Sequence, residues 1–274
     1  MNGRTFAFGK NWQAFIKHYL NQARIHEAKK SLTEFYGSDN FLKGKTFVDV
    51  GCGSGLFSLA AYQLGASKIM SFDVDVDAVR CCEYLRKKEG DPDNWHVSQG
   101  SILDKEFVSR FGKYDFVYSW GVLHHTGDMW KAIENTADIV ANGGLLYLAI
   151  YNKVDYWGID RDGRFGSSSF WLREKKIYSR LPLFLQNCID YGAMVAMIFL
   201  YLVTLNNPIK KICGHQENRG MSWRIDIKDW LGGYPYEYAS VDEIFHFIKK
   251  RGFVLENLKS SNGLRNNEYL FRKT

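Results

Sequence analysis

The chain has 274 residues, of which 46% are hydrophobic and 24% charged, and its net charge is +6. Four prolines and abundant apolar residues exclude a disordered or collagen-like chain, and the length suits one large domain or one domain with an insertion. Residues 1–150 contain 17 basic and 17 acidic residues, whereas residues 151–274 contain 19 and 13. The positive excess therefore lies in the second half, which we expect to meet the substrate or partner.

The cysteines and the first residues both favour a cytoplasmic protein. The five cysteines show no metal-ligand spacing, so we expect free thiols in a reducing compartment and no metal site. They are Cys52, Cys81, Cys82, Cys188 and Cys213. The first fifteen residues are too polar for a signal peptide.

Taken in chain order, the first forty residues read as helix. Their apolar residues Ile25, Ala28, Leu32 and Phe35 fall on one face at helical spacing. Short apolar runs then alternate with helical patterns. The expected strands are 46–50, 68–73, 96–98, 114–119 and 145–151, and the expected helices between them are 56–64, 76–88 and 130–140. This alternation is typical of βαβ units and a parallel sheet.

The alternation stops after residue 151. Residues 152–232 are rich in helical, aromatic and basic patterns, with loop signals at 163–169 and 206–218. At the end, Ser240 with Glu243 forms a capping box for a helix. The runs that follow, 253–258 and 268–272, are expected to pair as a final hairpin.

A glycine-rich turn joins the first strand to its helix, with the sequence Asp49-Val-Gly51-Cys-Gly53-Ser-Gly55. Glycine lets the backbone turn sharply and approach a ligand closely, and the helix start adds free N–H donors. The acid two residues before the first glycine would repel a pyrophosphate but suits an ammonium group. Asp73 ends the next strand, where a ribose diol is usually bound. A nicotinamide dinucleotide is the disfavoured alternative, because Asp49 is present and the x-x-G spacing is missing.

Five pieces of the sequence occur in the order and at the spacing of one enzyme family. They are VDVGCGSG (48–55), SFDVD (71–75), QGSILD (99–104), YDFVYSWGVLHHT (114–126) and NGGLLYLAIYN (142–152). On these pieces the sequence resembles the class I S-adenosylmethionine-dependent methyltransferases. The resemblance implies S-adenosylmethionine as cofactor and S-adenosylhomocysteine as product.

The resemblance also implies the fold and its division. The expected fold is a seven-stranded, doubly wound, Rossmann-like, mostly parallel sheet, with a helical insertion before the last two strands. The expected parts are an N-terminal helical lid (1–40), a cofactor-binding domain (41–151 and 233–274) and a helical and aromatic substrate insertion (152–232).

By this resemblance Asp49 lies beside the methionine amino group of the cofactor, and the three glycines lie under its methionine moiety. Asp73 takes the ribose hydroxyls and Val74 packs on the adenine. Many members have an Asp where this chain has Ser101, so the adenine contact rests here on Ser101, Ile102 or the backbone. The loop after the fourth strand, with Trp120 and Leu123, flanks both cofactor and substrate.

Two histidines are the candidate catalytic residues. His124 and His125 follow the fourth strand, at the sheet edge where open α/β folds bind ligands. A hydroxyl acceptor benefits from a general base, and histidine titrates near neutrality. Adjacent residues do not easily point at one substrate, so we favour His125 as the base; the alternative is that both are structural.

A second motif lies in residues 219–238, RGMSWRIDIKDWLGGYPYEY. The stretch WLGGYP-E resembles one in a subset of bacterial class I methyltransferases, which also have GVLHHT and an N-terminal FG-x-NW, here residues 8–12. Aromatic walls with a few acids suit a planar or sugar-like substrate. The candidate substrate-binding residues are Trp12, Tyr151, Tyr234, Tyr236 and Glu237. Alternatively, these aromatics pack the insertion onto the sheet.

The run from Tyr191 to Leu205 has 15 residues without a charge. A spanning helix needs about 20 apolar residues, whereas about 10–14 are usual for a core or interfacial helix. A buried helix, a peripheral membrane or lipid-substrate contact and a true span all stay open. Contact with a membrane is therefore an alternative to a purely cytoplasmic location.

The leading functional hypothesis is methyl transfer, by in-line displacement, to a small-molecule or a glycan- or lipid-linked acceptor, favouring oxygen. A tRNA or RNA methyltransferase is the competing enzyme, since wobble-uridine tRNA-modifying enzymes have a related loop after the fourth strand. The modest basic excess and the absence of a long Lys/Arg cluster argue against nucleic acid. A catalytically silent cofactor-binding subunit is the non-enzymatic alternative. The sequence specifies no oligomeric state.

Overall fold

The computed structural model describes residues 20–38, 40–158, 165–219 and 223–274. Half of the expected N-terminal segment 1–40, including Trp12, lies outside these residues. Within them, Asn21 caps the N-terminus of helix α2 (Gln22–Tyr36), because its side chain accepts a hydrogen bond from the Arg24 N–H at 3.0 Å. The predicted apolar stripe of this helix is its buried face.

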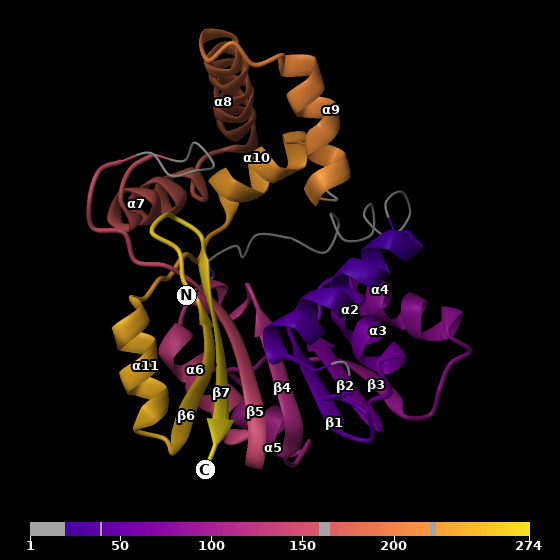
Figure 1. Cartoon of the computed structure of the whole chain (residues 1–274). Coiled ribbons are helices and arrows are strands. Elements are labelled where there is room, and N and C mark those ends of the chain that lie inside the picture. Colours follow the sequence, from indigo (N-terminus) through magenta and orange to yellow (C-terminus); the bar gives the residue numbers. More distant parts are fainter. Residues whose placement is uncertain (1–19, 39, 159–164, 220–222) are drawn as a thin grey trace.

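The described strands form one seven-stranded sheet in the order β3-β2-β1-β4-β5-β7-β6 (Figure 1). The strands are β1 (Thr46–Val50), β2 (Lys68–Asp73), β3 (Trp95–Gln99), β4 (Tyr114–Trp120), β5 (Val140–Tyr151), β6 (Phe253–Lys259) and β7 (Asn266–Lys273). The first five run parallel, and β7 is antiparallel to both β5 and β6. This confirms the predicted doubly wound, mostly parallel sheet and its final hairpin.

Helices cover both faces of the sheet because successive strand residues point to opposite sides. On β1, Phe47 packs into a core with α2, α3 and α4, whereas Val48 and Val50 pack into a second core with α5, α6 and α11. The covering helices are α3 (Leu56–Gln63), α4 (Val76–Lys88), α5 (Lys105–Ser109), α6 (Met129–Asp138) and α11 (Val241–Lys249). The apolar runs of the parallel strands are therefore buried on both faces, as expected for this class of sheet.

The predicted helix over 130–140 is shorter than expected. Helix α6 ends at Asp138, and Val140, placed on the helix by its spacing, is the first residue of β5. Val140 pairs with Tyr114 of β4 and is fully buried. Burial inside the sheet thus accounts for an apolar residue that also fits the helical period.

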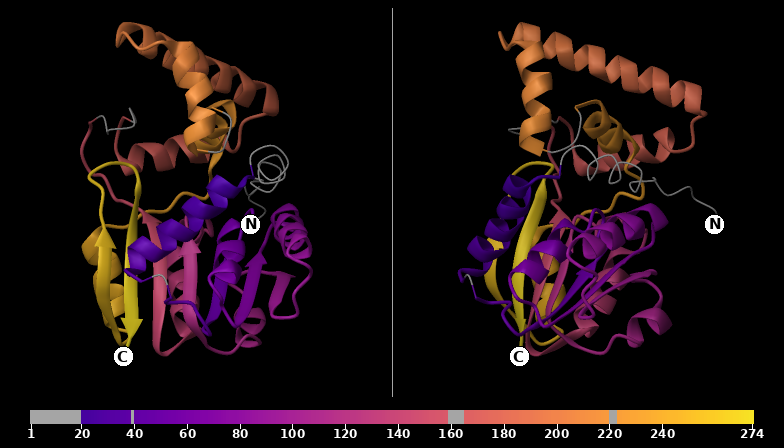
Figure 2. Two further views of the ribbon diagram at one scale, coloured as in Figure 1. Left: turned by 45° about the vertical axis from the view of Figure 1, so that its right-hand side comes forward. Right: turned by 90° about the vertical axis from the view of Figure 1, so that its right-hand side faces the viewer.

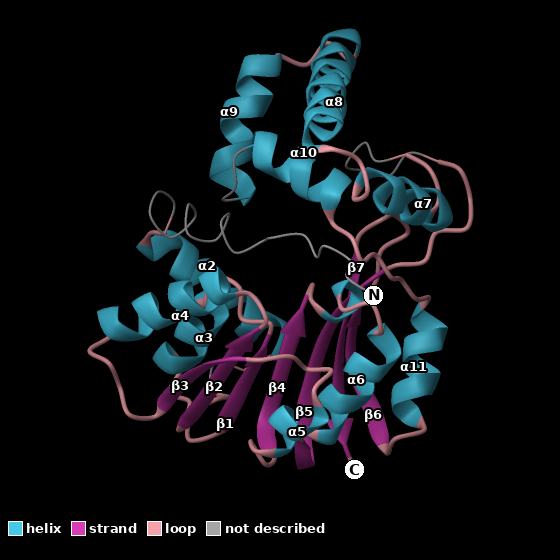
Figure 3. Ribbon diagram, turned by 180° about the vertical axis from the view of Figure 1, so that it is seen from behind, coloured by secondary structure: helices cyan, strands magenta, loops and turns pink. Residues whose placement is uncertain are grey.

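In the described part of the chain, four helices connect β5 to α11 and stand above the carboxyl edge of the sheet (Figures 1 and 3). They are α7 (Ser168–Tyr178), α8 (Leu183–Val203), α9 (Pro208–Arg219) and α10 (Trp223–Gly232), and residues of α7, α8 and α10 share a third apolar core. The prediction of a loop at 206–218 is wrong, because α9 occupies most of this range. Pro208 suits the first helical position, and the Asn207 side chain caps the helix by accepting a hydrogen bond from the Lys210 N–H at 3.2 Å.

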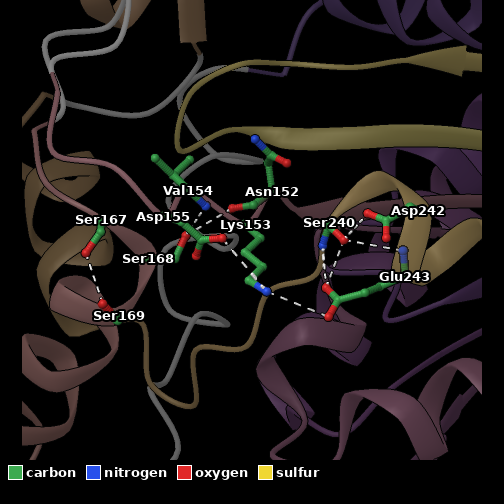
Figure 4. A network of polar contacts seen from close by, with 10 residues as sticks. All are labelled: Asn152, Lys153, Val154, Asp155, Ser167, Ser168, Ser169, Ser240, Asp242 and Glu243. Atoms are coloured by element: carbon green, nitrogen blue, oxygen red, sulfur yellow. Dashed lines mark hydrogen bonds and ion pairs between the residues drawn. The ribbon is translucent and has the colours of Figure 1, made fainter.

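The chain leaves the sheet and returns to it at one place. The Tyr151 carbonyl accepts a hydrogen bond from the Ala239 N–H, and the Ala239 carbonyl accepts one from the Lys153 N–H, each at 3.1 Å. Beside this pairing, Lys153 lies 3.8 Å from Glu243 of the α11 capping box (Figure 4). The two ends of the insertion are therefore joined to each other as well as to the sheet.

Asn152 is the buried centre of this junction. Its side-chain amide donates to the carbonyls of Ser261 (2.8 Å) and Gly263 (3.2 Å), and its side-chain oxygen accepts from the Asn267 amide at 2.9 Å. Three polar groups of the β6–β7 hairpin thus depend on one side chain that is 8% exposed.

We predict that Asn152→Ala lowers the free energy of unfolding by about 2–4 kcal/mol, because it leaves buried polar groups without partners. Denaturant unfolding of both proteins measures the change. Asn262→Ala is the matched control, since that side chain is exposed on the same hairpin turn and its loss should change stability little. Equal effects of the two substitutions would contradict the prediction.

Candidate active site

The predicted cofactor residues meet at one edge of the sheet. Strands β1 and β4 are neighbours in the middle of the sheet. After β1 the chain continues on one side, to β2, and after β4 it continues on the other side, to β5. Open α/β sheets bind ligands at such a point. Gly51 follows β1, Asp73 ends β2, Ser101 follows β3 and Trp120 ends β4. Because all four strands are parallel, these residues lie at the same carboxyl edge.

The glycine turn after β1 needs glycine for two reasons. Gly51, Gly53 and Gly55 have φ angles of +75°, +51° and +78°, a region that residues with a side chain rarely adopt. A Cβ on Gly51 would overlap Val122, and one on Gly55 would lie 2.8 Å from the Cα of Cys82. The turn therefore packs tightly against both α4 and the loop after β4.

Asp73 ties the ends of β1 and β2 together. Its carboxylate accepts hydrogen bonds from the N–H groups of Gly53 and Asp75, each at 3.0 Å. Burial raises the pKa of Asp73, and these backbone hydrogen bonds oppose that rise. A carboxylate has about four acceptor positions, so these two bonds leave room for a ligand hydroxyl.

The surroundings of Asp73 fit the adenosine part of the implied cofactor. Val74 is 60% exposed and Trp120 is 44% exposed, so apolar surface is open at the ends of both β2 and β4. An acid flanked by apolar surface suits a ribose diol joined to an aromatic base. When bound, S-adenosylmethionine would therefore be held by Asp73, Val74, Trp120 and the glycine turn.

Asp49 is the end of a buried chain of hydrogen bonds. The Trp95 indole N–H donates to Ser71 (2.9 Å), the Ser71 hydroxyl to Ser58 (2.7 Å) and the Ser58 hydroxyl to the Asp49 carboxylate (2.6 Å). Burial raises the pKa of Asp49 to about 7, the Ser58 hydrogen bond opposes the rise, and the charge of Asp73 adds to it. The acid is thus poised to respond to a nearby positive charge.

Two predicted cofactor contacts lie too deep to offer a ligand much surface. Ile102 is 4% exposed and Leu123 is fully buried, and both belong to the core beneath the sheet edge. Ser101 is half-buried, and its hydroxyl accepts a hydrogen bond from the Leu103 N–H at 3.2 Å. Ser101 is therefore the side chain of this piece that stays at the edge.

The two histidines occupy different environments on the short helix η1 (Leu123–His125). His124 is fully buried, and its Nδ1 accepts a hydrogen bond from the Tyr151 N–H at 3.3 Å. His125 Nδ1 lies 2.6 Å from the Pro235 carbonyl oxygen. A carbonyl only accepts, so Nδ1 of His125 carries the proton and Nε2 carries the lone pair.

Burial keeps both imidazoles neutral at pH 7. It lowers the pKa of His124 well below its usual value, with the charge of His125 adding to the effect. The pKa of His125 falls to about 4, chiefly by burial and secondarily by the positive charge of Lys175, while the Pro235 hydrogen bond opposes the fall. His125 is therefore in the form that can accept a proton.

An aromatic cluster, formed by Tyr151, Trp171, Trp230 and Tyr236, lies beside His125. The ring centre of Tyr151 is 5.5 Å from His125, 5.1 Å from Tyr236 and 6.3 Å from Trp230. Trp171 is 5.1 Å from Trp230. Strand β5, helices α7 and α10 and the segment after α10 thus each contribute one ring.

Lys175 lies inside the aromatic cluster and was not among the predicted site residues. It is 2% exposed, and its Nζ lies 4.5 Å from the ring centre of Trp230 and 5.3 Å from that of Tyr236. A Cβ on Gly233 would lie 3.5 Å from His125 Cε1 and 3.9 Å from Lys175 Nζ, so the two side chains approach the same glycine. The structure therefore brings a buried cation close to the candidate base.

The remaining predicted substrate residues lie in two different settings, the tyrosines in or near the aromatic cluster and Glu237 at the start of α6. Tyr236 is buried in the cluster, and Tyr234, two residues earlier, is half-buried. Glu237 accepts hydrogen bonds through both carboxylate oxygens from the Met129 N–H, at 3.2 and 3.0 Å, and so caps α6. Its position indicates a structural contact at a helix N-terminus, where a negative charge is stabilised. Among the described residues, no group of three His, Cys, Asp or Glu side chains could hold a metal ion.

The sheet order, the antiparallel last strand pair and the acid-and-glycine edge together define the fold and cofactor site of the S-adenosylmethionine-dependent methyltransferases. Residues 19–191 match a protein family described as "Methyltransferase domain", and the chain belongs to this family. S-adenosylmethionine is the cofactor of this class of enzyme.

The proteins similar to the chain include two curated relatives and one solved structure that bear on its function and fold. The ubiquinone biosynthesis O-methyltransferase of Pelagibacter ubique is 26% identical over 141 residues, 50% of this chain and 56% of that protein. The tRNA U34 carboxymethyltransferase of Campylobacter concisus is 26% identical over 172 residues, 62% and 49% of the two chains. The chain thus spans about half the length of these relatives.

The solved structure is magnesium protoporphyrin IX methyltransferase from Synechocystis PCC 6803 with bound S-adenosylhomocysteine. It has a TM-score of 0.54 at 14% identity and covers 97% of this chain and 94% of that one. It therefore shares the fold with this chain.

We predict that cofactor affinity depends on the ionisation of Asp49. With a pKa of about 7, the carboxylate is protonated below neutrality and then no longer attracts the cofactor's ammonium group. Affinity for S-adenosylmethionine should therefore fall about tenfold from pH 8 to pH 6, as measured by calorimetry.

Two variants assign this pH dependence to Asp49. Asp49→Asn should bind weakly and independently of pH over the same range, which distinguishes Asp49 from Asp73. Ser58→Ala removes the hydrogen bond that lowers the pKa, so its midpoint should move to higher pH. An unchanged midpoint in Ser58→Ala would contradict the role of the buried chain.

Proposed function

We propose that this methyltransferase moves the methyl group of S-adenosylmethionine to an oxygen of a small-molecule or a glycan- or lipid-linked acceptor, by in-line displacement. The acceptor binds between the sheet edge and the insertion, and His125 serves as the general base. The observation that carries this proposal is the hydrogen bond from His125 Nδ1 to the Pro235 carbonyl, because it presents Nε2 as the acceptor of a proton.

In methyl transfer, the protein mainly aligns the acceptor oxygen with the methyl group and removes the acceptor's proton. The bound cofactor supplies a methyl group on a positively charged sulfur, ready for attack. The chain's own residues hold the acceptor oxygen in line and exclude water, which together can account for several kcal/mol of the barrier. His125 takes the acceptor's proton, and the nearby Lys175 ammonium stabilises the negative charge that develops on oxygen.

The aromatic cluster supports a ring-containing acceptor. Flat side chains beside a neutral histidine suit a planar phenol or the apolar face of a sugar. The similarity to a ubiquinone biosynthesis O-methyltransferase agrees with transfer to an oxygen. We place Tyr151, Tyr234 and Tyr236 among the acceptor contacts, assign His124 to the support of Tyr151, and leave Glu237 at the helix cap.

RNA is the second candidate acceptor. Of the two curated relatives described above, the tRNA U34 carboxymethyltransferase matches more of this chain, 62% against 50%. Binding to RNA requires several phosphate contacts from Lys and Arg. The net charge of +6 on 274 residues is small for that purpose. We therefore favour the small-molecule or lipid-linked acceptor.

We predict that His125→Asn lowers kcat roughly a hundredfold to ten-thousandfold, the usual contribution of a general base. The asparagine amide can still donate to Pro235, so the loop should keep its conformation. Affinity for S-adenosylmethionine, measured by calorimetry, should stay within about twofold of the wild type. His246→Asn, on the exposed side of α11, is the matched control. A fully active His125→Asn enzyme would exclude this histidine as the base.

The acceptor class is tested with methyl-labelled S-adenosylmethionine and extracts separated into lipid, small-molecule and RNA fractions. We predict label in the lipid or small-molecule fraction, and none with His125→Asn. Label that appears only in RNA would reverse the choice of acceptor. Cofactor binding without transfer to any fraction would instead support a silent cofactor-binding subunit.

A further inference from the structure

Helix α8 has two apolar faces, and the rest of the described chain covers only one. Asp190, Met194 and Tyr201 lie on its inner face, at offsets of 0, 4 and 11 residues, and pack toward α7 and α10. On the outer face, Val195 and Phe199 are each 66% exposed and lie one helical turn apart. Only 11% of the most apolar 18-residue stretch of this helix is buried.

The exposed apolar surface continues beyond the carboxyl end of α8. Leu205 after α8 is 96% exposed and Ile209 of α9 is 73% exposed. We call this surface the outer apolar face. Its members are Leu183, Phe184, Leu185, Ile189, Val195, Phe199, Leu200, Leu202, Val203, Leu205 and Ile209. Soluble monomers rarely expose so many large apolar side chains together, and such patches usually mark an interaction site.

The outer apolar face lies at one end of the molecule. In Figure 1 helices α8 and α9 stand beyond α7 and α10, at the end opposite the chain's C-terminus. In the right-hand view of Figure 2, α8 runs across this end along its length. A flat partner could therefore contact the helix without meeting the sheet.

The exposed charged residues between 176 and 213 have one sign. All of this range lies within the described part of the chain, and its exposed charged residues are Lys176, Arg180, Lys210 and Lys211, of which Lys210 and Lys211 follow the exposed Ile209 directly on α9. The one acid in this range, Asp190, is 4% exposed and accepts a hydrogen bond from the Tyr178 hydroxyl at 2.6 Å. Apolar side chains with a basic border fit the hydrocarbon boundary and the negative headgroups of an anionic bilayer.

The packing favours a helix that lies on the bilayer over one that crosses it. By length and composition α8 could span a membrane, with 21 residues. However, α10 packs against α7, α8 and α9, so the helices before and after α8 share one neighbour on the same side. A spanning α8 would have to separate from the inner-face contacts that hold it in the insertion.

A second copy of this chain fits the face less well. A two-fold contact would bring identical surfaces together, and Lys210 and Lys211 beside the face would meet no exposed acid from residues 176–213 of the other copy. We therefore propose that the outer apolar face docks the protein on an anionic membrane surface, with α8 lying parallel to the bilayer. This docking does not depend on which acceptor the enzyme methylates.

The test is flotation of the full chain with phosphatidylcholine vesicles that contain about a third phosphatidylserine, compared with vesicles of phosphatidylcholine alone. We expect binding to the anionic vesicles that weakens with salt. The double substitution Val195→Glu with Phe199→Glu should weaken binding roughly tenfold or more. Lys210→Glu with Lys211→Glu should reduce the preference for anionic vesicles. Val254→Glu, at an exposed position on β6, is the matched control and should bind as the wild type does.

Affinity for S-adenosylmethionine and thermal unfolding show whether each variant is folded, so a failed fold is not mistaken for lost docking. The proposal is overturned if the wild type does not float, if it floats equally with both kinds of vesicle, or if the Val195 and Phe199 substitutions change nothing. It is also overturned if the wild type is a dimer that these substitutions dissociate without any vesicle binding. Retention in membranes after an alkaline wash would show a spanning helix instead.

Discussion

The return of the chain from the insertion is held by its backbone against the carboxyl edge of the sheet, and the candidate site depends on this contact. Residues 235–239 are hydrogen-bonded to His124, His125 and Tyr151. The same contacts orient the imidazole of His125 and place α10 above the edge. A methyltransferase sheet alone would leave His125 open to water. With the segment in place, the histidine is half-buried and the Tyr151 ring lies beside it, 5.5 Å away between ring centres.

Burial acts on the acid and the base of this site in the same physical way, with opposite results for pKa. Removal of water disfavours the charged form of any group, so the pKa of Asp49 rises to about 7 and that of His125 falls to about 4. At neutral pH Asp49 is therefore only partly ionised until a cation approaches it, and His125 is neutral.

Local patterns were sufficient for the sheet, because β1, β2 and β4 are short, largely apolar runs that end in an acid or are followed by a glycine. They were insufficient at Val140, where burial in the sheet decided between strand and helix. They were also insufficient at Asn207, whose side chain caps α9 although the surrounding residues favour a turn. In the site, the glycine turn and Asp73 could be placed from sequence because a single strand–turn–helix unit carries them. Lys175 could not, since its role arises from α7 packing onto α10, and its spacing of four from Trp171 was the one available signal.

Helix α7 connects the candidate site to the outer apolar face. The helical period places Trp171, Lys175 and Tyr178 on one side, where all three are buried against α8 and α10, and Lys176 and Arg180 on the other, where both are exposed. Tyr178 donates to Asp190 of α8, so the inner face of the proposed membrane helix is hydrogen-bonded to the helix that carries the buried lysine. A partner that binds α8 thereby contacts a segment packed directly on the candidate site. This proximity would let an amphiphilic acceptor keep its apolar part at the bilayer while its reacting oxygen lies beside His125, and it gives a physical reason for one insertion to carry both surfaces.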